Sequence, residues 1–186
     1  MRIFLLPALA VVAWPPWAAE VAAVEHKGPD WILKTDKVRR VVTLEGGRLF
    51  TSRWQDLASG RQLLGERDRS EDLAGEGWTL VGASERKQAN GSFEFSVKVR
   101  RGGLEAAKTY VLYPGSSIIR ERVKLSNAGT EALKIEEPQF LNTRVRLGGR
   151  DSVDFHWMTG GYNHLGSWVL RTETLPADKS RTRTSA

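Results

Sequence analysis

The strongest constraint on the fold of this chain is a strict alternation of apolar and polar residues. The stretch SFEFSVKVR shows it most clearly, with Phe93, Phe95, Val97 and Val99 in one phase and Glu94, Ser96, Lys98 and Arg100 in the other. Successive side chains of a β-strand point to opposite faces of a sheet. The stretch is therefore predicted to be a strand with one buried face.

Turn signals separate several stretches of this kind. Asn90-Gly91 lies between this strand and an earlier one that starts near Trp78, and the pair suits the positive φ angles of a tight hairpin. Gly46-Gly47 and Pro114-Gly115 mark further breaks, whereas the charged residues 65–77 read as a loop or at most one helical turn. Many short strands with frequent turns predict an all-β, antiparallel β-sandwich with little helix.

The N-terminal residues 1–23 have the features of an export signal. Arg2 supplies a basic start, an apolar run follows, and small residues precede an expected cleavage site before Val24. A membrane anchor would need about 20 uninterrupted apolar residues, and Pro15, Pro16 and Glu20 break the run. We expect residues 24–186 to form one secreted or periplasmic β-sandwich domain, with no membrane attachment after cleavage.

Charge and cysteine content exclude several functions. The chain carries 28 Lys and Arg against 22 Asp and Glu, a formal net charge of +6. The basic residues are spread along the predicted strands; Arg120 and Arg122, for example, flank Glu121 in what reads as a solvated sheet face, so no nucleic-acid partner is predicted. Cysteine is absent, which rules out disulfides, thiolate catalysis and cysteine zinc sites.

Carboxylates and histidines offer no clear catalytic or metal centre. A glycoside hydrolase normally places two carboxylates across the scissile bond, and the candidate pairs are Glu71/Asp72, Glu136/Glu137 and Asp151/Asp154. The first pair lies in a charged loop where solvation explains it, the second would point to opposite faces of a strand, and nothing sets the separation of the third. His156 and His164 are eight residues apart, and Asp151 and Asp154 could add oxygen ligands, but this spacing is not diagnostic of a metal site. No catalytic residue, metal or cofactor is predicted.

Aromatic residues suggest carbohydrate binding instead. The run HWMTGGYNHLGSW, residues 156–168, combines flat aromatic faces that stack on sugar rings with polar groups that reach hydroxyls. The candidate binding residues are Trp157, Tyr162, Asn163, His164 and Trp168. By contrast, Trp54 and Trp78 lie inside alternating strands and are predicted to belong to the core.

Three segments together resemble a known family. They are RRVVTLEGGRLFTSRWQDLASGRQLL, YPGSSIIRERVKLSNAGTEALKIEE and GGYNHLGSWVLRTETL. The second segment contains a motif that begins at Pro114 and continues through Ile119-Arg120, Val123, Asn127 and Gly129. The chain is similar in these segments to the N-terminal β-supersandwich of family 36 glycoside hydrolases, the α-galactosidase type, and related supersandwiches occur in sugar mutarotases.

The resemblance implies a carbohydrate context. In that family the two catalytic aspartates lie on a downstream (β/α) barrel, and no residue of this chain matches them. The expectation is a non-catalytic module, either a gene fragment truncated before the barrel or a free-standing domain, whose partners are carbohydrate and a missing or separate barrel.

The sequence allows two alternatives to a non-catalytic carbohydrate-binding module. The first is a mutarotase-like enzyme, in which His156 or His164 acts as the acid and Glu136, Glu137 or Asp154 as the base. The second is a structural or protein-binding sandwich with no sugar site.

Overall fold

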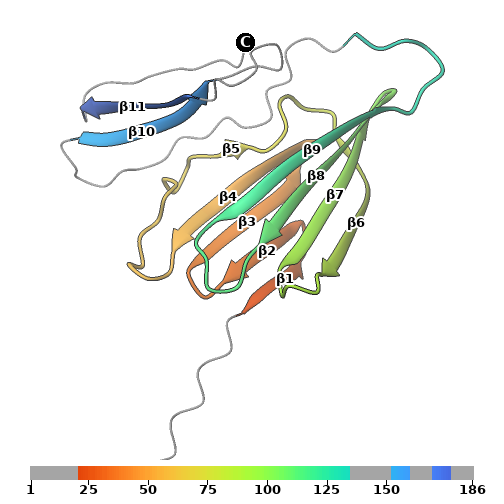
Figure 1. Cartoon of the computed structure of the whole chain (residues 1–186). Helices are drawn as coiled ribbons and strands as arrows, with labels where there is room; N and C mark the ends of the chain where they lie inside the picture. The colour runs from red at the N-terminus through yellow and green to blue at the C-terminus, as the bar shows by residue number, and fades with distance from the viewer. Residues whose placement is uncertain (1–20, 135–151, 160–168, 177–186) are drawn as a thin grey trace, which may run out of the picture.

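The computed structural model describes the backbone of residues 21–134, 152–159 and 169–176, and the side chains of residues 21–134 and 172–174. All regular structure in these ranges is β-strand (Figure 1). The first sheet contains β1 (Ala22–Lys27), β2 (Asp30–Thr35), β3 (Val38–Glu45), β4 (Arg48–Asp56) and β5 (Ser70–Glu71). The second contains β6 (Thr79–Lys87), β7 (Phe93–Arg101), β8 (Leu104–Leu112) and β9 (Ile119–Asn127). A separate two-stranded sheet pairs β10 (Ser152–Thr159) with β11 (Val169–Pro176).

Both larger sheets are meanders in which each strand pairs antiparallel with the next one in the chain. The β3–β4 hairpin turns at Gly46 and Gly47, whose φ angles of 57° and 72° are those of a two-residue turn with a right-handed twist. Residues that carry a side chain rarely adopt these φ angles. A Cβ on Gly47 would also lie 2.8 Å from the backbone nitrogen of Gly77, so only glycine fits there.

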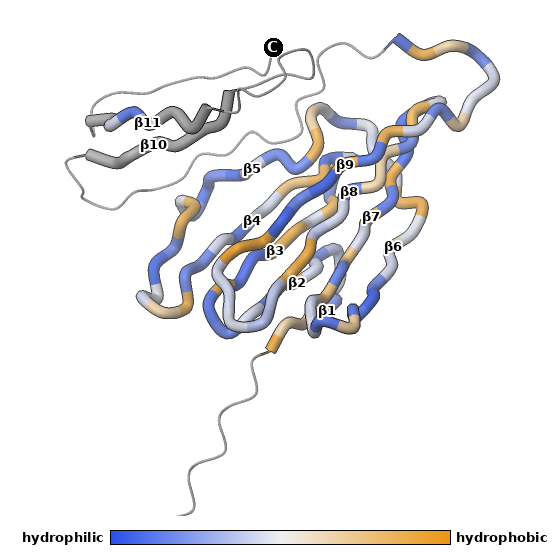
Figure 2. Tube along the Cα trace, viewed as in Figure 1, coloured by the Kyte–Doolittle hydropathy of each residue, from blue (hydrophilic) through white to orange (hydrophobic). Residues whose placement is uncertain are grey.

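The two sheets pack face to face, with β1 across from β7 and β2 across from β8 (Figure 1). This confirms the predicted antiparallel β-sandwich. Figure 2 shows apolar and polar residues interspersed along the strands of the two larger sheets, as expected for strands with one buried face. The buried cluster between the sheets comprises Trp31, Leu33, Val42, Leu49, Leu73, Trp78, Phe95, Val97, Val99, Ala106, Tyr110 and Leu112.

The β6–β7 hairpin confirms the predicted strand faces but corrects the predicted turn. Phe95, Val97 and Val99 are fully buried, as expected from the alternation. No described residue other than glycine has a positive φ, so Asn90 does not take the left-handed conformation that we expected. Its side-chain oxygen instead accepts hydrogen bonds from the backbone N–H and hydroxyl of Ser92, and Gly91 alone supplies the positive φ.

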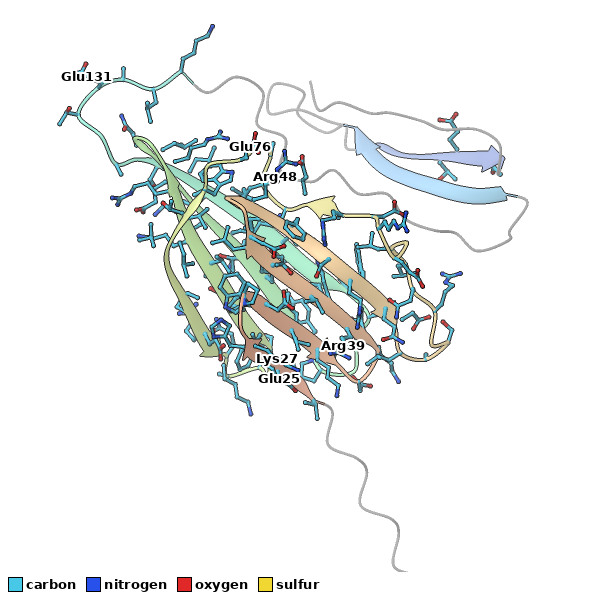
Figure 3. The ribbon with its side chains drawn as sticks, turned by 180° about the vertical axis from the view of Figure 1, so that it is seen from behind. Glu25, Lys27, Arg39, Arg48, Glu76 and Glu131 are labelled. Atoms are coloured by element: carbon cyan, nitrogen blue, oxygen red, sulfur yellow. The ribbon has the colours of Figure 1, made fainter. Side chains whose placement is uncertain are left out.

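The two sheets are offset, so that their edges are unequally covered. Leu80 and Val81 of β6 are 51% and 45% exposed because β1, which faces β7, is the edge strand of the opposite sheet. Charged side chains such as Glu25, Lys27 and Arg39 lie around the rim of the sandwich in Figure 3.

At the other edge, β3 lies across from β9, and the described part of the second sheet has no further strand to lie across from β4. The chain around Asp72 and Leu73 covers the first part of β4, where Leu49 and Thr51 are fully buried, and the end of the strand is less covered. Trp54, near the end of that strand, is only half-buried. It was predicted to be a core residue, and it lies instead at the border of the core.

The N-terminal strand overlaps the predicted signal segment. Ala22 and Ala23 pair with Thr35 and Lys34 of β2, so cleavage before Val24 would shorten β1 and leave the pairs from Val24 to Lys27. Within the ranges that the structure describes, no helix is long and apolar enough to cross a membrane.

Candidate functional site

Four charged residues meet between the two sheets and form what we call the inter-sheet ion network: Arg40 of β3, Asp72 just after β5, Lys108 of β8 and Glu121 of β9. Arg40 pairs through one guanidinium nitrogen with Asp72 and through the other with Glu121. The Lys108 ammonium lies 2.6 Å from the second oxygen of Glu121. Two positive and two negative charges thus neutralise one another inside the sandwich.

Neutral groups complete the contacts of Arg40. The Arg40 Nε donates to the Thr51 hydroxyl at 2.7 Å, and that hydroxyl donates to Asp72 at 2.9 Å. The guanidinium also lies over two aromatic rings, 4.8 Å from the centroid of Trp54 and 5.3 Å from that of Tyr110. The side chains of Arg40 and Asp72 have no solvent exposure, so these two residues depend on contacts within the protein instead of on water.

Burial and the charges of the network compete, and the pKa values of its two carboxylates shift in opposite directions. Burial disfavours the charged form of Arg40, but the nearby Asp72 and Glu121 carboxylates outweigh this and raise the pKa of the guanidinium. Burial raises the pKa of Asp72 in spite of the attraction from Arg40 and Lys108. For Glu121 the penalty of burial is smaller than that attraction, and its pKa is lowered.

Two neighbouring carboxylates with pKa values shifted in opposite directions are typical of acid–base sites. Catalysis by this network is disfavoured, however, because a substrate could not reach it. Asp72 is completely buried, and none of the four residues lines any of the three pockets described below. Structural ion-pair networks also perturb pKa values. We therefore interpret the network as a connection that holds the two sheets together.

A small pocket lies next to this network, at the end of β4. It has a volume of about 260 Å³ and is called here the Trp54 pocket. Since the Trp54 ring also covers Arg40, this side chain separates the pocket from the ion network. The lining residues are Lys37, Val38, Trp54, Asp56, Arg61, Leu63 and Ser117.

A tight turn after β4 shapes one wall of the Trp54 pocket. The Asp56 N–H donates to the Arg61 carbonyl at 2.9 Å, and the Leu63 N–H donates to the Trp54 carbonyl at 2.7 Å, so the chain returns alongside β4. The hydrogen bond from the Ser59 hydroxyl is the first cause that lowers the pKa of Asp56. Asp56 is thus an ionised carboxylate that is held by its own turn.

Two hydrogen-bond donors of this pocket's residues are unsatisfied. The indole Nε1 of Trp54 and the guanidinium Nε of Arg61 are buried and have no acceptor among the described residues. A buried donor without a partner costs about 1 to 3 kcal/mol. Because both atoms are closed to solvent, they are a cost of the fold at this corner and do not themselves face the pocket.

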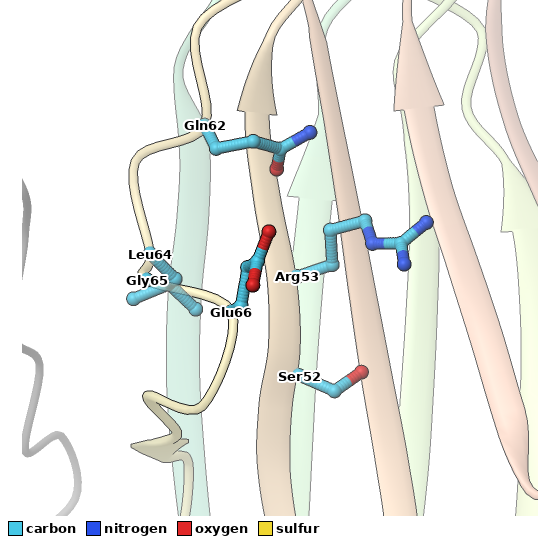
Figure 4. Close-up of a pocket in the computed structure, with 6 residues that line it drawn as sticks. All are labelled: Ser52, Arg53, Gln62, Leu64, Gly65 and Glu66. Carbon is cyan, nitrogen blue, oxygen red and sulfur yellow. The ribbon is translucent and has the colours of Figure 1, made fainter.

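A wider groove runs along the outer edge of β4, with a volume of about 720 Å³ (Figure 4). It arises because residues 61–63 and β5 both pair with β4, whereas the chain between them leaves the sheet. Gln62 and Glu66 extend into this space in Figure 4. The lining residues are Ser52, Arg53, Gln62, Leu64, Gly65 and Glu66, and they include no aromatic ring.

A third, open pocket of about 400 Å³ lies on the outer face of the second sheet, between Tyr113, Arg120 and Arg122. Arg122 pairs with Glu94 at 2.9 Å, and the charges alternate in sign across the surface. Arg120 and Arg122 are exposed, as predicted, but Glu121 between them points inward to Arg40 and Lys108. The prediction that this whole stretch is solvated was therefore wrong for Glu121.

The Glu71/Asp72 pair needs the same correction. Its residues were predicted to be solvated in a charged loop, and Asp72 is instead completely buried against Arg40. The sequence carried a signal for the other three members of the network. Arg40, Lys108 and Glu121 each occupy the apolar phase of an alternating strand, where an unpaired charge would be too costly to bury.

The sugar-binding residues predicted from sequence lie outside what the structure describes in side-chain detail. The backbone of Trp157 belongs to β10, opposite Arg171 of β11. Tyr162, Asn163, His164 and Trp168 lie outside the described residues altogether. Trp78 is 4% exposed, which confirms its predicted place in the core. Within the described ranges, no group of three His, Asp or Glu side chains could hold a metal ion.

Comparisons with known proteins add no relative. No known protein family has a model that matches the chain, and a search of curated proteins finds no significant match. The chemistry of the pockets must therefore carry the functional argument.

Proposed function

We propose that the chain is an exported, non-catalytic β-sandwich that binds carbohydrate, as an accessory module of an α-galactosidase-type glycoside hydrolase. Its catalytic partner would be a (β/α) barrel that carries the two aspartates of that family. The observation that carries the proposal is the Trp54 pocket, where an indole adjoins the charged or hydroxyl groups of Lys37, Asp56, Arg61 and Ser117. Carbohydrate sites combine an aromatic surface with a few polar groups in this way.

The carboxylates favour binding over hydrolysis. Each of the three pockets described above is lined by a single carboxylate: Glu66, Glu94 or Asp56. Glycoside hydrolysis normally needs two that flank the same bond. The family resemblance in the sequence agrees, since it places catalysis on another domain.

The test is a binding titration of the purified full chain with galactose-containing oligosaccharides, followed by tryptophan fluorescence and calorimetry. We expect saturable binding, and no hydrolysis of aryl α-galactosides. Trp54→Ala should abolish binding, whereas Leu80→Ala should leave it unchanged because that side chain is 51% exposed at the far edge of the sandwich.

Loss of the contact with Arg40 could unfold the Trp54→Ala variant, so Trp54→Phe serves as a second variant. It keeps an aromatic ring beside the guanidinium and should retain the fold and weaker binding. A folded wild-type chain that binds no sugar would refute the proposal. The proposal would also be refuted if the purified chain hydrolysed aryl α-galactosides and substitutions in the chain altered that activity.

A further inference from the structure

The polar groups of the Trp54 pocket are mostly hydrogen-bond donors. The charged side chains of Lys37 and Arg61 can donate hydrogen bonds but cannot accept them. The Trp54 ring lines the pocket, but its N–H is itself buried. The carboxylate of Asp56, the pocket's acidic group, already accepts from the Ala58 N–H at 3.1 Å and from the Ser59 hydroxyl at 2.6 Å. The pocket therefore offers donors in excess, which suits a ligand rich in acceptor oxygens.

The charges in and around the pocket do not cancel completely. The Lys37 ammonium lies 3.3 Å from the carboxylate of the neighbouring Asp36. Arg61 makes no ion pair with the described residues, although it is close enough to Asp56 to help lower the pKa of that carboxylate. Arg61 is thus the cation of the pocket without a direct counterion, and its buried Nε lacks an acceptor.

The remaining lining is apolar. Val38 and Leu63 complete the wall with the Trp54 ring. At about 260 Å³, the pocket is smaller than the 300 Å³ or so at which typical small-molecule sites begin. One sugar ring, with an apolar face and a charged substituent, suits this size and mixture better than an inorganic anion does.

We propose that the Trp54 pocket is specific for an acidic sugar, and that the guanidinium of Arg61 binds the sugar's carboxylate. This inference rests on the proposed carbohydrate-binding function and names its ligand class. The planar guanidinium can donate two parallel hydrogen bonds to a carboxylate. The sugar ring would pack against the Trp54 ring that lines the pocket.

A matched pair of probes tests the proposal. D-galacturonate and D-galactose differ in the carboxylate that replaces the C6 hydroxymethyl group, and each is titrated into the full chain by calorimetry. We expect the acid to bind at least about ten-fold more tightly, since charge-assisted hydrogen bonds contribute about 1.5 kcal/mol or more. Arg61→Gln should remove this preference and leave the weak binding of galactose.

Two further variants exclude general explanations. Arg120→Gln removes the same charge from an exposed arginine in the pocket on the other sheet and should leave the preference unchanged. Arg61→Lys keeps the charge but loses the planar fork, and it should lose most of the preference. This variant also keeps the test valid if Arg61→Gln fails to fold.

The outcomes separate the inference from the function on which it rests. Equal binding of both sugars would overturn the inference and leave the proposed function standing, whereas binding of neither would overturn both. If Arg61→Gln and Arg120→Gln lost the preference for galacturonate equally, the preference would come from the overall charge of the protein, and the inference would be overturned. Displacement of galacturonate by sodium sulfate at equal concentration would indicate a plain anion site, and it would also overturn the inference.

Discussion

Replacing Arg40 with methionine tests how strongly the inter-sheet ion network holds the sandwich together. The change keeps an unbranched side chain of moderate size, so the main loss is electrostatic. It removes the ion pairs with Asp72 and Glu121 and the hydrogen bond from Nε to Thr51. It also removes the contacts of the guanidinium with the Trp54 and Tyr110 rings.

The expected cost follows from what remains behind. Asp72 has no solvent exposure, so without Arg40 its carboxylate keeps only Thr51 and the more distant attraction of Lys108. Removing one partner of a buried ion pair typically costs about 3 to 5 kcal/mol. We expect Arg40→Met to lower the free energy of unfolding at pH 7 by that amount, a large part of the stability of a domain of this size.

The measurement is urea unfolding, followed by circular dichroism and tryptophan fluorescence and extrapolated linearly to water. A second readout is pH. Without Arg40 the pKa of Asp72, already raised by burial, should rise further. A carboxyl group whose pKa is higher in the folded than in the unfolded state makes the folded protein relatively more stable as the pH falls. The deficit of Arg40→Met relative to the wild type should therefore shrink between pH 7 and pH 5.

A combined variant in which apolar residues of similar size replace all four charged residues is the control. Such replacements of a complete buried network are often neutral or stabilising, by about 1 to 4 kcal/mol. The reasoning would be refuted if Arg40→Met cost less than about 1 kcal/mol with an unchanged urea slope. That result would mean that Asp72 finds solvent or another partner at little cost.

Three further predictions concern the turn, the titration and the offset of the sheets. Gly47→Ala should destabilise the chain by about 1 to 3 kcal/mol in urea unfolding, and more than Gly28→Ala, whose Cβ would meet no atom within 4 Å; equal costs would contradict the close approach of Gly77. Because the pKa of Glu121 is lowered, its carboxylate stabilises the folded chain above the ordinary pKa of 4.5, and this stabilisation is lost as the pH falls through the folded-state pKa. The difference in free energy of unfolding between the wild type and Glu121→Gln should therefore narrow in acid. A difference that stays constant with pH would contradict the lowered pKa. Leu80→Ser should change the free energy of unfolding by less than about 0.5 kcal/mol, whereas Leu33→Ala, in the core, should cost about 2 to 5 kcal/mol; a large effect of Leu80→Ser would show that β6 is covered.

The sequence alone determined the strands and their faces. Alternation placed Phe95, Val97 and Val99 on a buried face because the period of a strand is two residues and any shift by one would expose the whole set. Gly46-Gly47 predicted the first long hairpin for an equally local reason, since glycine adopts positive φ without strain. Local rules of this kind were enough to predict an antiparallel sandwich.

Only the tertiary structure decided which residues meet. Arg40 and Glu121 are 81 positions apart, and Arg40 and Asp72 are 32 apart. Alternation shows that a charge points inward but does not show which strand of the opposite sheet lies across from it. For the same reason Asp72 was predicted to be solvated and proved to be buried.

The Trp54 pocket depends on tertiary structure in the same way. It combines Lys37 before β3, Trp54 at the end of β4 and Ser117 before β9, and no spacing in the sequence relates these positions. The packing of the two sheets brings these residues together at the end of β4. Sequence patterns report the local period of the backbone, whereas a binding site depends on the long-range packing of strands, which only the folded chain determines.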